Sequence, residues 1–327
     1  MKVARWQRLD GTIEAGFVHD GHVIPLPDGR PVDALIVAGL PTALALGREL
    51  IEADERGGWR PLDTVRLLPP VVPSSVRDFV TFEEHVEGMV KLSNPDARVS
   101  DAWYDAPTFY FTNPHTMIGT NQSVVPPRCA ELDFELEVAV VIGARRECDG
   151  RNLTVERAEE QIFGYAIFND WSARDLQARE MQVSLGPCKG KDFASTLGPW
   201  IVTADEMAAR RDERGFLDVE VSVDINGERF GGDNLTHMAW TFPEMIAYAS
   251  RDSRVAPGDV LASGTTARGC LAETWGRSGR VDPPALKAGD TVRIVVDGIG
   301  EIVNTVAPPR DSQVAIPAAR RRIVRSA

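Results

Sequence analysis

Hydrophobic and polar positions alternate with a period of two along much of this chain. The clearest case is the run ELDFELEVAVV at residues 131–141, where acidic side chains occupy every second position before the run becomes wholly apolar. A period of two places successive side chains on opposite faces of a β-strand. The run therefore predicts a strand with an acidic face that continues into a core. Four like charges on one face require solvent or a cation beside them. Glu131 and Asp133 are predicted to be the solvated approach to the strand, whereas Glu135 and Glu137 lie where it enters the core.

Turn dipeptides divide the rest of the pattern into short elements. Asp10-Gly11 and Asp20-Gly21 separate short strands near the start, and Asn226-Gly227 and Asp297-Gly298 each predict a β-hairpin later in the chain. Residues 31–56 and 241–252 predict helices. Because the strands do not alternate regularly with crossover helices, a doubly wound sheet is disfavoured. The pattern favours an α+β, β-rich fold built on a mixed β-roll or β-barrel.

Closely spaced prolines mark a domain boundary. The segment LLPPVVP at residues 67–73 suits neither a helix nor a strand, because proline fixes φ and lacks a backbone donor. We therefore predict a small N-terminal α+β domain at residues 1–70. Residues 71–327 then form one catalytic domain.

Composition removes several classes of function. The 327 residues carry 48 acidic and 36 basic side chains, a formal net charge of -12, which argues against nucleic acid as a partner. The basic run at residues 320–325 is predicted to be a solvated end. No apolar stretch approaches membrane-spanning length and the start lacks a secretory pattern, so we expect a cytoplasmic protein with no membrane partner. The four cysteines lie far apart, which favours reduced, structural thiols over a disulfide framework.

The first candidate chemistry is the acid pair Glu135 and Glu137. Side chains two apart on a strand point the same way, so both carboxylates can meet one ion, and hard oxygen ligands suit Mg²⁺, Mn²⁺ or Ca²⁺. A wet amphipathic strand is the ordinary explanation of such a pair. The apolar run that follows it, and a second acid at Asp170 directly after another apolar strand, weaken that explanation.

Other segments hold groups that suit acid–base chemistry or anion binding. Asp78 and His85 lie seven residues apart in RDFVTFEEHVEGM, and histidine is the natural proton shuttle near neutral pH. Arg174 and Gln177 stand three apart, on one side of a predicted helix. Taken singly, each of these residues is more typical of a surface position.

Two glycine-punctuated loops complete the set. GPCKGKDF holds Lys189 and Lys191 but lacks the P-loop pattern, and the loop at residues 262–273 ends in Glu273. The chain contains no GxSxG, HExxH or GxGxxG motif, so serine hydrolase, zincin and dinucleotide-binding functions lack support.

In this order, these segments resemble the fumarylacetoacetate hydrolase family. The similarity runs from Asp78 to Val306, and its most specific parts are LDFELE, NDWSARDLQ and the SGT…E loop. The resemblance implies a mixed β-roll catalytic domain, a homodimer, and a bound Mg²⁺ (or Mn²⁺ or Ca²⁺) held by carboxylates.

Matched position by position, the resemblance assigns roles to individual residues. The implied metal ligands are Asp78, Glu135, Glu137 and Asp170. The implied catalytic residues are His85, Glu273 and Lys191. The implied substrate-binding residues are Arg174, Gln177 and Thr265.

The chain also departs from the family pattern. Val80 and Met181 stand where the family hydrolase has tyrosines that recognise the substrate carboxylate. The segment from Asp170 to Lys191 is one residue longer, which leaves Lys189 as the alternative active-site lysine. We therefore expect a substrate related to fumarylacetoacetate rather than that compound itself.

The implied reaction is hydrolysis of a C–C bond in an acylpyruvate-type 1,3-dicarbonyl acid. His85, oriented by Glu273, would activate water, and Lys191 and Arg174 would stabilise the negative charge that develops. One alternative is decarboxylation or isomerisation of a 2-oxo acid, or hydration of a 2-oxo-alkenoate, at the same site. A second is a non-catalytic metal-binding protein that kept the fold.

Overall fold

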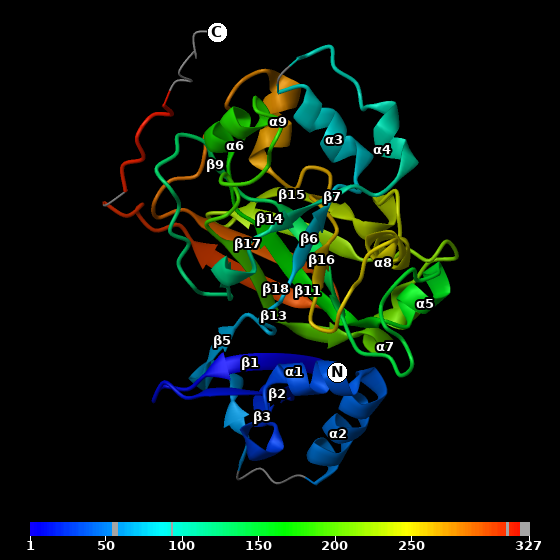
Figure 1. The fold of residues 1–327 in the computed structure, drawn as a ribbon. Coiled ribbons are helices and arrows are strands. Elements are labelled where there is room, and N and C mark those ends of the chain that lie inside the picture. Colours follow the sequence, from blue (N-terminus) through cyan, green and yellow to red (C-terminus); the bar gives the residue numbers. More distant parts are fainter. Residues whose placement is uncertain (54–57, 93, 312–313, 321–327) are drawn as a thin grey trace.

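The computed structural model describes residues 1–53, 58–92, 94–311 and 314–320 (Figure 1). The α+β, β-rich class is confirmed: a large mixed sheet forms the middle of the molecule and helices lie around it. The predicted solvated basic run at residues 320–325 lies, apart from Arg320, outside the described residues. Part of the first predicted helical segment, residues 54–56, lies outside them as well.

Most strands belong to one 12-stranded sheet with the order β4-β3-β2-β1-β13-β11-β10-β16-β6-β7, with β5 beside β1 and β8 beside β13. Its members are β1 (Lys2–Gln7), β2 (Ile13–His19), β3 (His22–Pro25), β4 (Arg60–Pro61), β5 (Arg66–Leu68), β6 (Val76–Phe79), β7 (Phe109–Thr112), β8 (Met117–Ile118), β10 (Leu136–Ile142), β11 (Ile162–Asp170), β13 (Ser195–Thr203) and β16 (Val260–Ala262). Among the described strands the order has two open ends, so the sheet is not a closed barrel.

Two smaller sheets and the helices complete the fold. The smaller sheets contain β9 (Leu132–Asp133) with β12 (Ser172–Ala173), and β14 (Glu220–Ile225), β15 (Glu228–Asn234), β17 (Thr291–Val296) and β18 (Gly300–Thr305). The α-helices are α1 (Val32–Ala38), α2 (Leu40–Glu52), α3 (Glu83–Val90), α4 (Asp101–Asp105), α5 (Val155–Glu159), α6 (Arg174–Met181), α7 (Ala204–Met207), α8 (Phe242–Ser250) and α9 (Leu271–Ser278). Short 3₁₀ turns occur at Pro27–Gly29, Leu62–Thr64, Pro114–Thr116, Ala208–Arg210 and Leu235–His237.

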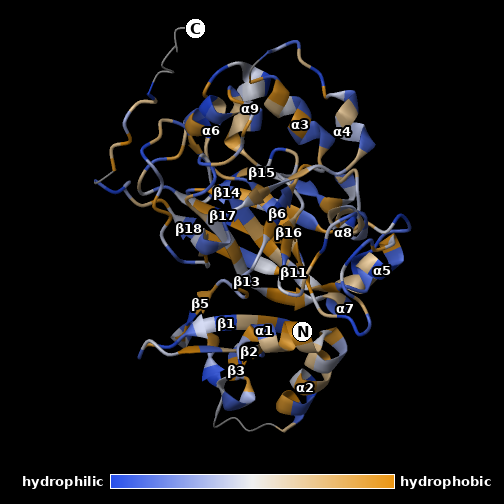
Figure 2. Cartoon of the chain, in the orientation of Figure 1, coloured by the Kyte–Doolittle hydropathy of each residue, from blue (hydrophilic) through white to orange (hydrophobic). Residues whose placement is uncertain are grey.

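Burial of the central strands explains why they are apolar on both faces. Every residue of β10 and β11 is buried, and the two strands pair antiparallel with Leu136 opposite Asn169. Figure 2 shows the apolar colour gathered on the inner strands, while the outer loops are largely hydrophilic. A strand covered on both faces has no wet side, so its alternation is lost. Polar side chains at the ends of these strands are consequently held in a dry, rigid setting.

Both predicted hairpins are confirmed. Asn226 and Gly227 have φ values of 53° and 84°, which suit the tight turn joining β14 to β15. Gly298, with φ of 78°, lies in the turn that joins β17 to β18. The left-handed backbone at these positions explains why glycine occupies them.

The stretch at residues 131–141 differs from the single strand that its alternation predicts. It breaks between β9, which pairs with β12, and β10, which pairs with β11. The chain changes partner there, and the Glu135 backbone N–H donates to the side chain of Asn169 (3.0 Å). The prediction of a wet acidic approach is also wrong at Asp133, whose side chain is fully buried. Hydrogen-bond partners from distant segments replace solvent around it.

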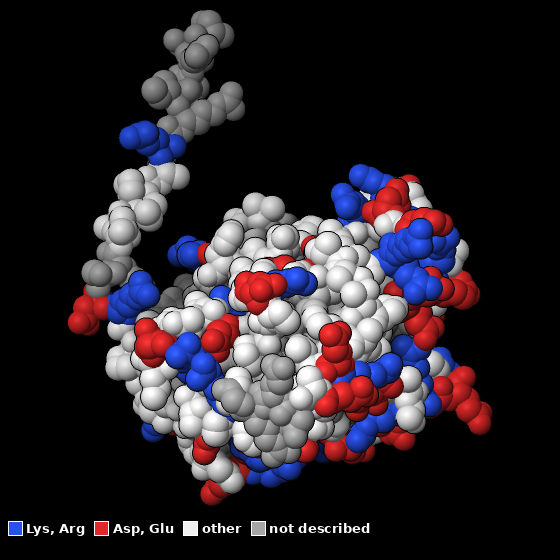
Figure 3. All heavy atoms as spheres, turned by 90° about the horizontal axis from the view of Figure 1, so that it is seen from below, with Lys and Arg blue, Asp and Glu red and all other residues white. Residues whose placement is uncertain are grey.

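The N-terminal strands extend the large sheet. β1 pairs antiparallel with β13, with Val3 opposite Ile201, so the N-terminal segment lies at one end of the molecule and shares its main sheet with the rest. The domain boundary near residue 70 stays a prediction. Figure 3 views the molecule from this end, and basic side chains stand beside acidic ones over that face. Among the described helices, none combines the length and the hydrophobicity of a transmembrane span.

Candidate metal and catalytic site

Three buried carboxylates from distant parts of the chain meet at one end of the sheet. Each of Asp78, Glu135 and Asp170 offers an oxygen that lies within 4.8 Å of the other two. Asp78 lies on β6, whose parallel pairing with β16 sets its position, and Asp170 is the last residue of β11. Glu135 lies just before β10, which pairs with β11 and so brings Glu135 beside Asp170.

The donor set fits a hard divalent cation. All three carboxylates are almost completely buried, and oxygen Oδ1 of Asp78 has no hydrogen-bond partner. Several like charges in a dry site are unfavourable without a compensating cation. Because the cluster offers carboxylate oxygens and no sulfur, these residues fit Mg²⁺ or Mn²⁺ better than zinc.

Lys191 supplies a positive charge to the cluster. Its ammonium group lies 2.8 Å from Oδ2 of Asp170 and forms a second ion pair with Glu135. Lys189, by contrast, is exposed and pairs with Asp192. The structure therefore brings Lys191, and not Lys189, to the carboxylates.

Tyr110 also faces the cluster, although it was not among the residues predicted from the sequence. Its hydroxyl lies 2.8 Å from Oδ2 of Asp78 and 2.5 Å from Oδ2 of Asp170. The alternation in FYFT separates Tyr110 from its phenylalanine neighbours, but only the pairing of β6 with β7 sets it opposite Asp78. Burial, followed by the Asp170 charge, raises the pKa of Tyr110 well above its ordinary value, so the phenol stays a hydrogen-bond donor.

Glu137 lies beside this group but has other partners. Its Oε2 accepts a hydrogen bond from the Gly264 N–H (3.1 Å), and the Thr265 hydroxyl lies 3.4 Å from its Oε1. Gly264 has φ of 81°, which a glycine adopts readily where the loop turns toward the sheet. Glu137 is outside the group of mutually close ligand atoms found among the described residues, so its role as a ligand stays a prediction.

Two carboxylates of the cluster have pKa values shifted in opposite directions. Burial and the neighbouring Asp170 charge raise the pKa of Asp78 well above its ordinary value. Burial also acts to raise the pKa of Glu135, but Lys191 and Arg174 outweigh it and leave the pKa at about 2. Glu135 is therefore ionised near neutral pH, whereas a proton or a metal ion stabilises Asp78.

Arg174 connects the cluster to Asp133. Its Nη2 lies 2.7 Å from Oδ2 of Asp133 and 2.8 Å from Oε1 of Glu135, and its Nη1 donates to Gln177 (3.1 Å). The predicted proximity of Arg174 and Gln177 on one helix is thus confirmed. Asp133, which the sequence analysis treated as a bystander, also accepts hydrogen bonds from the N–H groups of Leu271 and Ala272 at the start of α9.

His85 and Glu273 meet where α3 packs on α9. Nδ1 of His85 lies 3.5 Å from Oε2 of Glu273, and both side chains are buried. Two glycines permit this approach. A Cβ at Gly88 would come within 2.2 Å of the Glu273 side chain, and one at Gly276 within 2.1 Å of the Gly88 carbonyl oxygen. The two helices therefore bring the His85 imidazole and the Glu273 carboxylate together.

The dyad lies close to the carboxylate cluster. The charge of His85 is among the causes that lower the pKa of Glu135, and Arg174 contacts Glu135 from the other direction. Cys270, at the start of α9, places its sulfur 3.8 Å from Nδ1 of His85. The combined site holds carboxylate oxygens that could hold a cation, an imidazole, and two buried cationic side chains.

A match to a known family covers this whole arrangement. The family described as Fumarylacetoacetate (FAA) hydrolase C-terminal matches residues 74–307, which include all of the residues described above. The chain belongs to the fumarylacetoacetate hydrolase family.

Relatives in this family differ in the reaction that they are named for. The fumarylacetoacetase of Arabidopsis thaliana is 28% identical over 266 residues, 67% of this chain and 63% of that protein. The chain thus spans less than two thirds of the length of that relative. The structure of a 5-carboxymethyl-2-hydroxymuconate delta-isomerase from Mycobacterium smegmatis is 26% identical, with a TM-score of 0.65 and coverage of 94% of this chain and 100% of the other.

A third relative shares the fold at lower identity. A maleylpyruvate hydrolase from Sphingobium sp. SYK-6, solved in complex with manganese (II) ion and pyruvate, is 23% identical, with a TM-score of 0.65 and coverage of 95% of this chain and 100% of the other. The family scaffold therefore carries both hydrolases and isomerases.

Within the family fold, the two positions that lack tyrosine lie apart from the cluster's hydrogen bonds. The carbonyl of Val80 accepts a hydrogen bond from the Trp103 indole (2.8 Å), and the side chain of Met181 is 54% exposed. Tyr110 is the tyrosine whose hydroxyl contacts the carboxylates.

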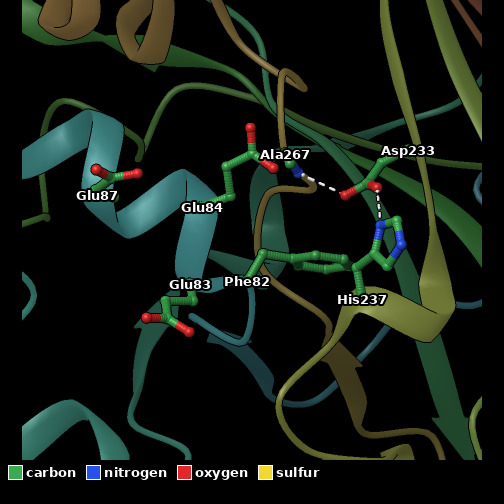
Figure 4. Close-up of a pocket in the computed structure, with 7 residues that line it drawn as sticks. All are labelled: Phe82, Glu83, Glu84, Glu87, Asp233, His237 and Ala267. Carbon is green, nitrogen blue, oxygen red and sulfur yellow. Dashed lines mark hydrogen bonds and ion pairs between the residues drawn. The ribbon is translucent and has the colours of Figure 1, made fainter.

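An acidic pocket opens beside the dyad. Its volume is about 410 Å³, and it is lined by Phe82, Glu83, Glu84, Glu87, Asp233, His237 and Ala267. Figure 4 shows the glutamates of α3 on one side and the Asp233–His237 pair on the other, with the loop that carries Ala267 between them. Asp233 holds this loop by accepting a hydrogen bond from the Ala267 N–H (2.9 Å).

Proposed function

We propose that this protein is a divalent-metal-dependent hydrolase that cleaves a C–C bond in an acylpyruvate-type 1,3-dicarbonyl acid. The observation that carries the proposal is the buried His85–Glu273 pair beside the cluster of Asp78, Glu135 and Asp170. A hydrolase needs a base for water next to a group that polarises the carbonyl, and this site offers residues for both.

The dyad provides the base. With Nδ1–H directed at Glu273, the other ring nitrogen of His85 is left with a free lone pair that can take a proton from water. The Glu273 carboxylate is held in turn by the Arg268 N–H (2.8 Å) and by Nε of Arg277 (3.2 Å). A base with a fixed orientation then directs the hydroxide toward the substrate carbonyl.

Cationic side chains stabilise the charge that develops as the C–C bond breaks. The electrons of that bond pass to the leaving fragment as an enolate, and Lys191 and Arg174 are the buried cations at the cluster. The surrounding carboxylates raise the pKa of Lys191, despite the opposing effect of its burial, so the ammonium stays charged. In this proposal, the neutral side chains of Gln177 and Thr265 bind oxygen atoms of the substrate.

A Mg²⁺ or Mn²⁺ ion at Asp78, Glu135 and Asp170 would supply Lewis-acid polarisation of the substrate carbonyl. The manganese (II) and pyruvate recorded with the maleylpyruvate hydrolase relative support both the ion class and the 2-oxo acid class. We keep Glu137 as a proposed fourth carboxylate at this site.

Turnover assays test the proposal. Purified protein with Mg²⁺ or Mn²⁺ should convert an acylpyruvate to pyruvate and a carboxylic acid, EDTA should abolish turnover, and added metal should restore it. The variant His85→Gln should lose roughly 10²–10⁴-fold in rate, since it removes the general base. Unchanged turnover in that variant would exclude His85 from the mechanism.

Isomerisation or decarboxylation of a 2-oxo acid is the second candidate, which the similarity to the Mycobacterium smegmatis isomerase favours. Those reactions do not require attack by water. A protein that converts oxaloacetate or a 2-oxo-alkenoate, is inert toward acylpyruvates and tolerates His85→Gln would favour this candidate. The homodimer implied by the family and the cytoplasmic location expected from the sequence stay predictions.

A further inference from the structure

A second group of ligand atoms surrounds His85, and it differs chemically from the carboxylate cluster. His85, Cys270 and Glu273 each offer one ligand atom within 4.8 Å of the other two, and all three side chains are buried. The set comprises one nitrogen, one sulfur and one oxygen. The reaction proposed above uses the histidine and the glutamate but gives the cysteine no task.

The spacing of these atoms matches the coordination sphere of zinc. Zinc bonds of about 2.1 Å to nitrogen or oxygen and about 2.3 Å to sulfur place tetrahedral N and O ligands about 3.4 Å apart, and N and S ligands about 3.6 Å apart. The observed distances from Nδ1 of His85 are 3.5 Å to Glu273 Oε2 and 3.8 Å to Cys270 Sγ. The two distances from Nδ1 lie within a few tenths of an ångström of the tetrahedral values, and the sulfur lies within 4.8 Å of the glutamate ligand atom.

The backbone already holds the three groups in place. Cys270 is the N-cap of α9, and its sulfur accepts a hydrogen bond from the Glu273 N–H (3.4 Å). Glu273 is fixed by Arg268 and Arg277, and His85 is brought to it by the close packing of α3 on α9. A bound ion would therefore have to order these three side chains very little.

The donors also decide which metal suits each site. Nitrogen and thiolate ligands favour zinc and related borderline metals, whereas an all-carboxylate cluster favours Mg²⁺ or Mn²⁺. A thiol binds a metal as the thiolate, and a metal such as zinc ionises a coordinating thiol outright, whereas hard cations prefer oxygen ligands. Mg²⁺ at working concentrations would therefore leave this group unoccupied.

We propose that His85, Cys270 and Glu273 form a separate Zn²⁺ site that switches the enzyme off. Binding releases the thiol proton to solvent and puts the metal on Nδ1 of His85, so that the remaining imidazole proton resides on Nε2. A ring in that state cannot accept a proton from water. The inhibitory part rests on the proposed function, whereas the binding part rests on the three residues alone.

The acidic pocket lies next to the segments that carry His85 and Cys270. The glutamates at the start of α3, the helix that carries His85, line one side of it, and the loop that carries Ala267, shortly before Cys270 in the chain, lies between them and the Asp233–His237 pair (Figure 4). Glu84 and Glu87 on that wall have side chains 57% and 43% exposed, and each forms an ion pair with Arg277 (3.5 and 3.3 Å).

Cobalt(II) reports a sulfur ligand directly. The full-length protein, with saturating Mg²⁺ present, is titrated with Co²⁺, whose bonding to a thiolate produces a charge-transfer band in the near ultraviolet. The matched variants are Cys270→Ser and, as a control, Cys188→Ser at an exposed cysteine far from the dyad in sequence. Serine is a preferred N-cap residue, so Cys270→Ser keeps the cap of α9 and the fold.

We expect one equivalent of Co²⁺ to give the band in the unaltered protein and in Cys188→Ser, with Zn²⁺ displacing it, and no band in Cys270→Ser. A missing band in the unaltered protein, or a band that survives in Cys270→Ser, overturns the site. Inhibition is measured with saturating Mg²⁺ and a substrate that the protein converts, and each variant is compared with its own rate without zinc. Cys270→Ser should raise the Zn²⁺ concentration that halves the rate by at least about 100-fold. A cobalt band with no inhibition by Zn²⁺ would uphold the site and overturn the role of His85 as the base.

Discussion

Asp133 is the residue at which one small change should disturb both halves of the site. We consider Asp133→Asn, which keeps the volume and one carbonyl oxygen but replaces the other oxygen with an NH₂ group. The carboxylate is fully buried, so solvent cannot take over its hydrogen bonds. It joins Arg174 to the first turn of α9, which carries Glu273.

The expected cost follows from the donors around this carboxylate. Oδ1 accepts from the N–H groups of Phe134 (2.8 Å) and Leu271 (2.8 Å), and Oδ2 accepts from Ala272 (3.0 Å) and twice from Arg174 (2.8 and 2.7 Å). Whichever oxygen becomes NH₂, at least two buried donors lose their acceptor, at about 1–3 kcal/mol each. Breaking a buried ion pair at one end costs about 3–5 kcal/mol, and we expect a loss of that size.

Urea unfolding, followed by tryptophan fluorescence, measures the loss. The control is Glu131→Gln, the same chemical change two residues earlier, at a partly exposed side chain, which should stay within about 0.5 kcal/mol of the unaltered protein. The turnover number of Asp133→Asn should also fall, because α9 and Arg174 shift together. A stability loss below about 1 kcal/mol with an unchanged dependence on urea would refute the buried network as drawn.

Three further outcomes follow from the structure. Asp259→Ala should destabilise the protein by about 3–5 kcal/mol in the same urea assay, because it removes the carboxylate that lies 3.0 Å from the buried Arg77 guanidinium. A stability loss as small as that of Glu131→Gln would contradict this. Iodoacetamide at pH 8 should label the exposed Cys188 well before Cys129, because burial and the Asp175 charge raise the pKa of Cys129 to about 11. Peptide mass spectrometry measures the order of labelling, and equal labelling rates would contradict the prediction. Mn²⁺ at a hundredfold excess over its Kd should add about 2.7 kcal/mol of stability to the unaltered protein and so raise its melting temperature. Asp170→Asn should show no such rise. Equal shifts of the two proteins in scanning fluorimetry would place the ion elsewhere.

Local patterns in the chain were sufficient for the elements and for part of the site. An apolar run located β10, period-two alternation located the strands of both hairpins, and turn dipeptides located the hairpin turns, because these signals act between neighbouring residues. The spacing of three also placed Arg174 beside Gln177. Such features need no knowledge of distant segments.

Partners that lie far apart in the chain required the tertiary structure. Asp133 appeared to be a solvated acid until the fold supplied Arg174, 41 positions away, and the start of α9. Tyr110 gained a site position only through the pairing of β7 with β6. Lys191 was separated from Lys189 by burial rather than by spacing.

By itself, therefore, the sequence determined several of the strands, the turns of both hairpins, and which residue types are available for oxygen coordination and acid–base chemistry. The tertiary structure alone decided which acidic side chains are buried, which basic side chain each one pairs with, and that Cys270 lies beside His85. The physical reason is that a side chain's chemistry is carried by its own covalent structure. Its burial and its partners depend on contacts between strands and helices that are remote in the chain.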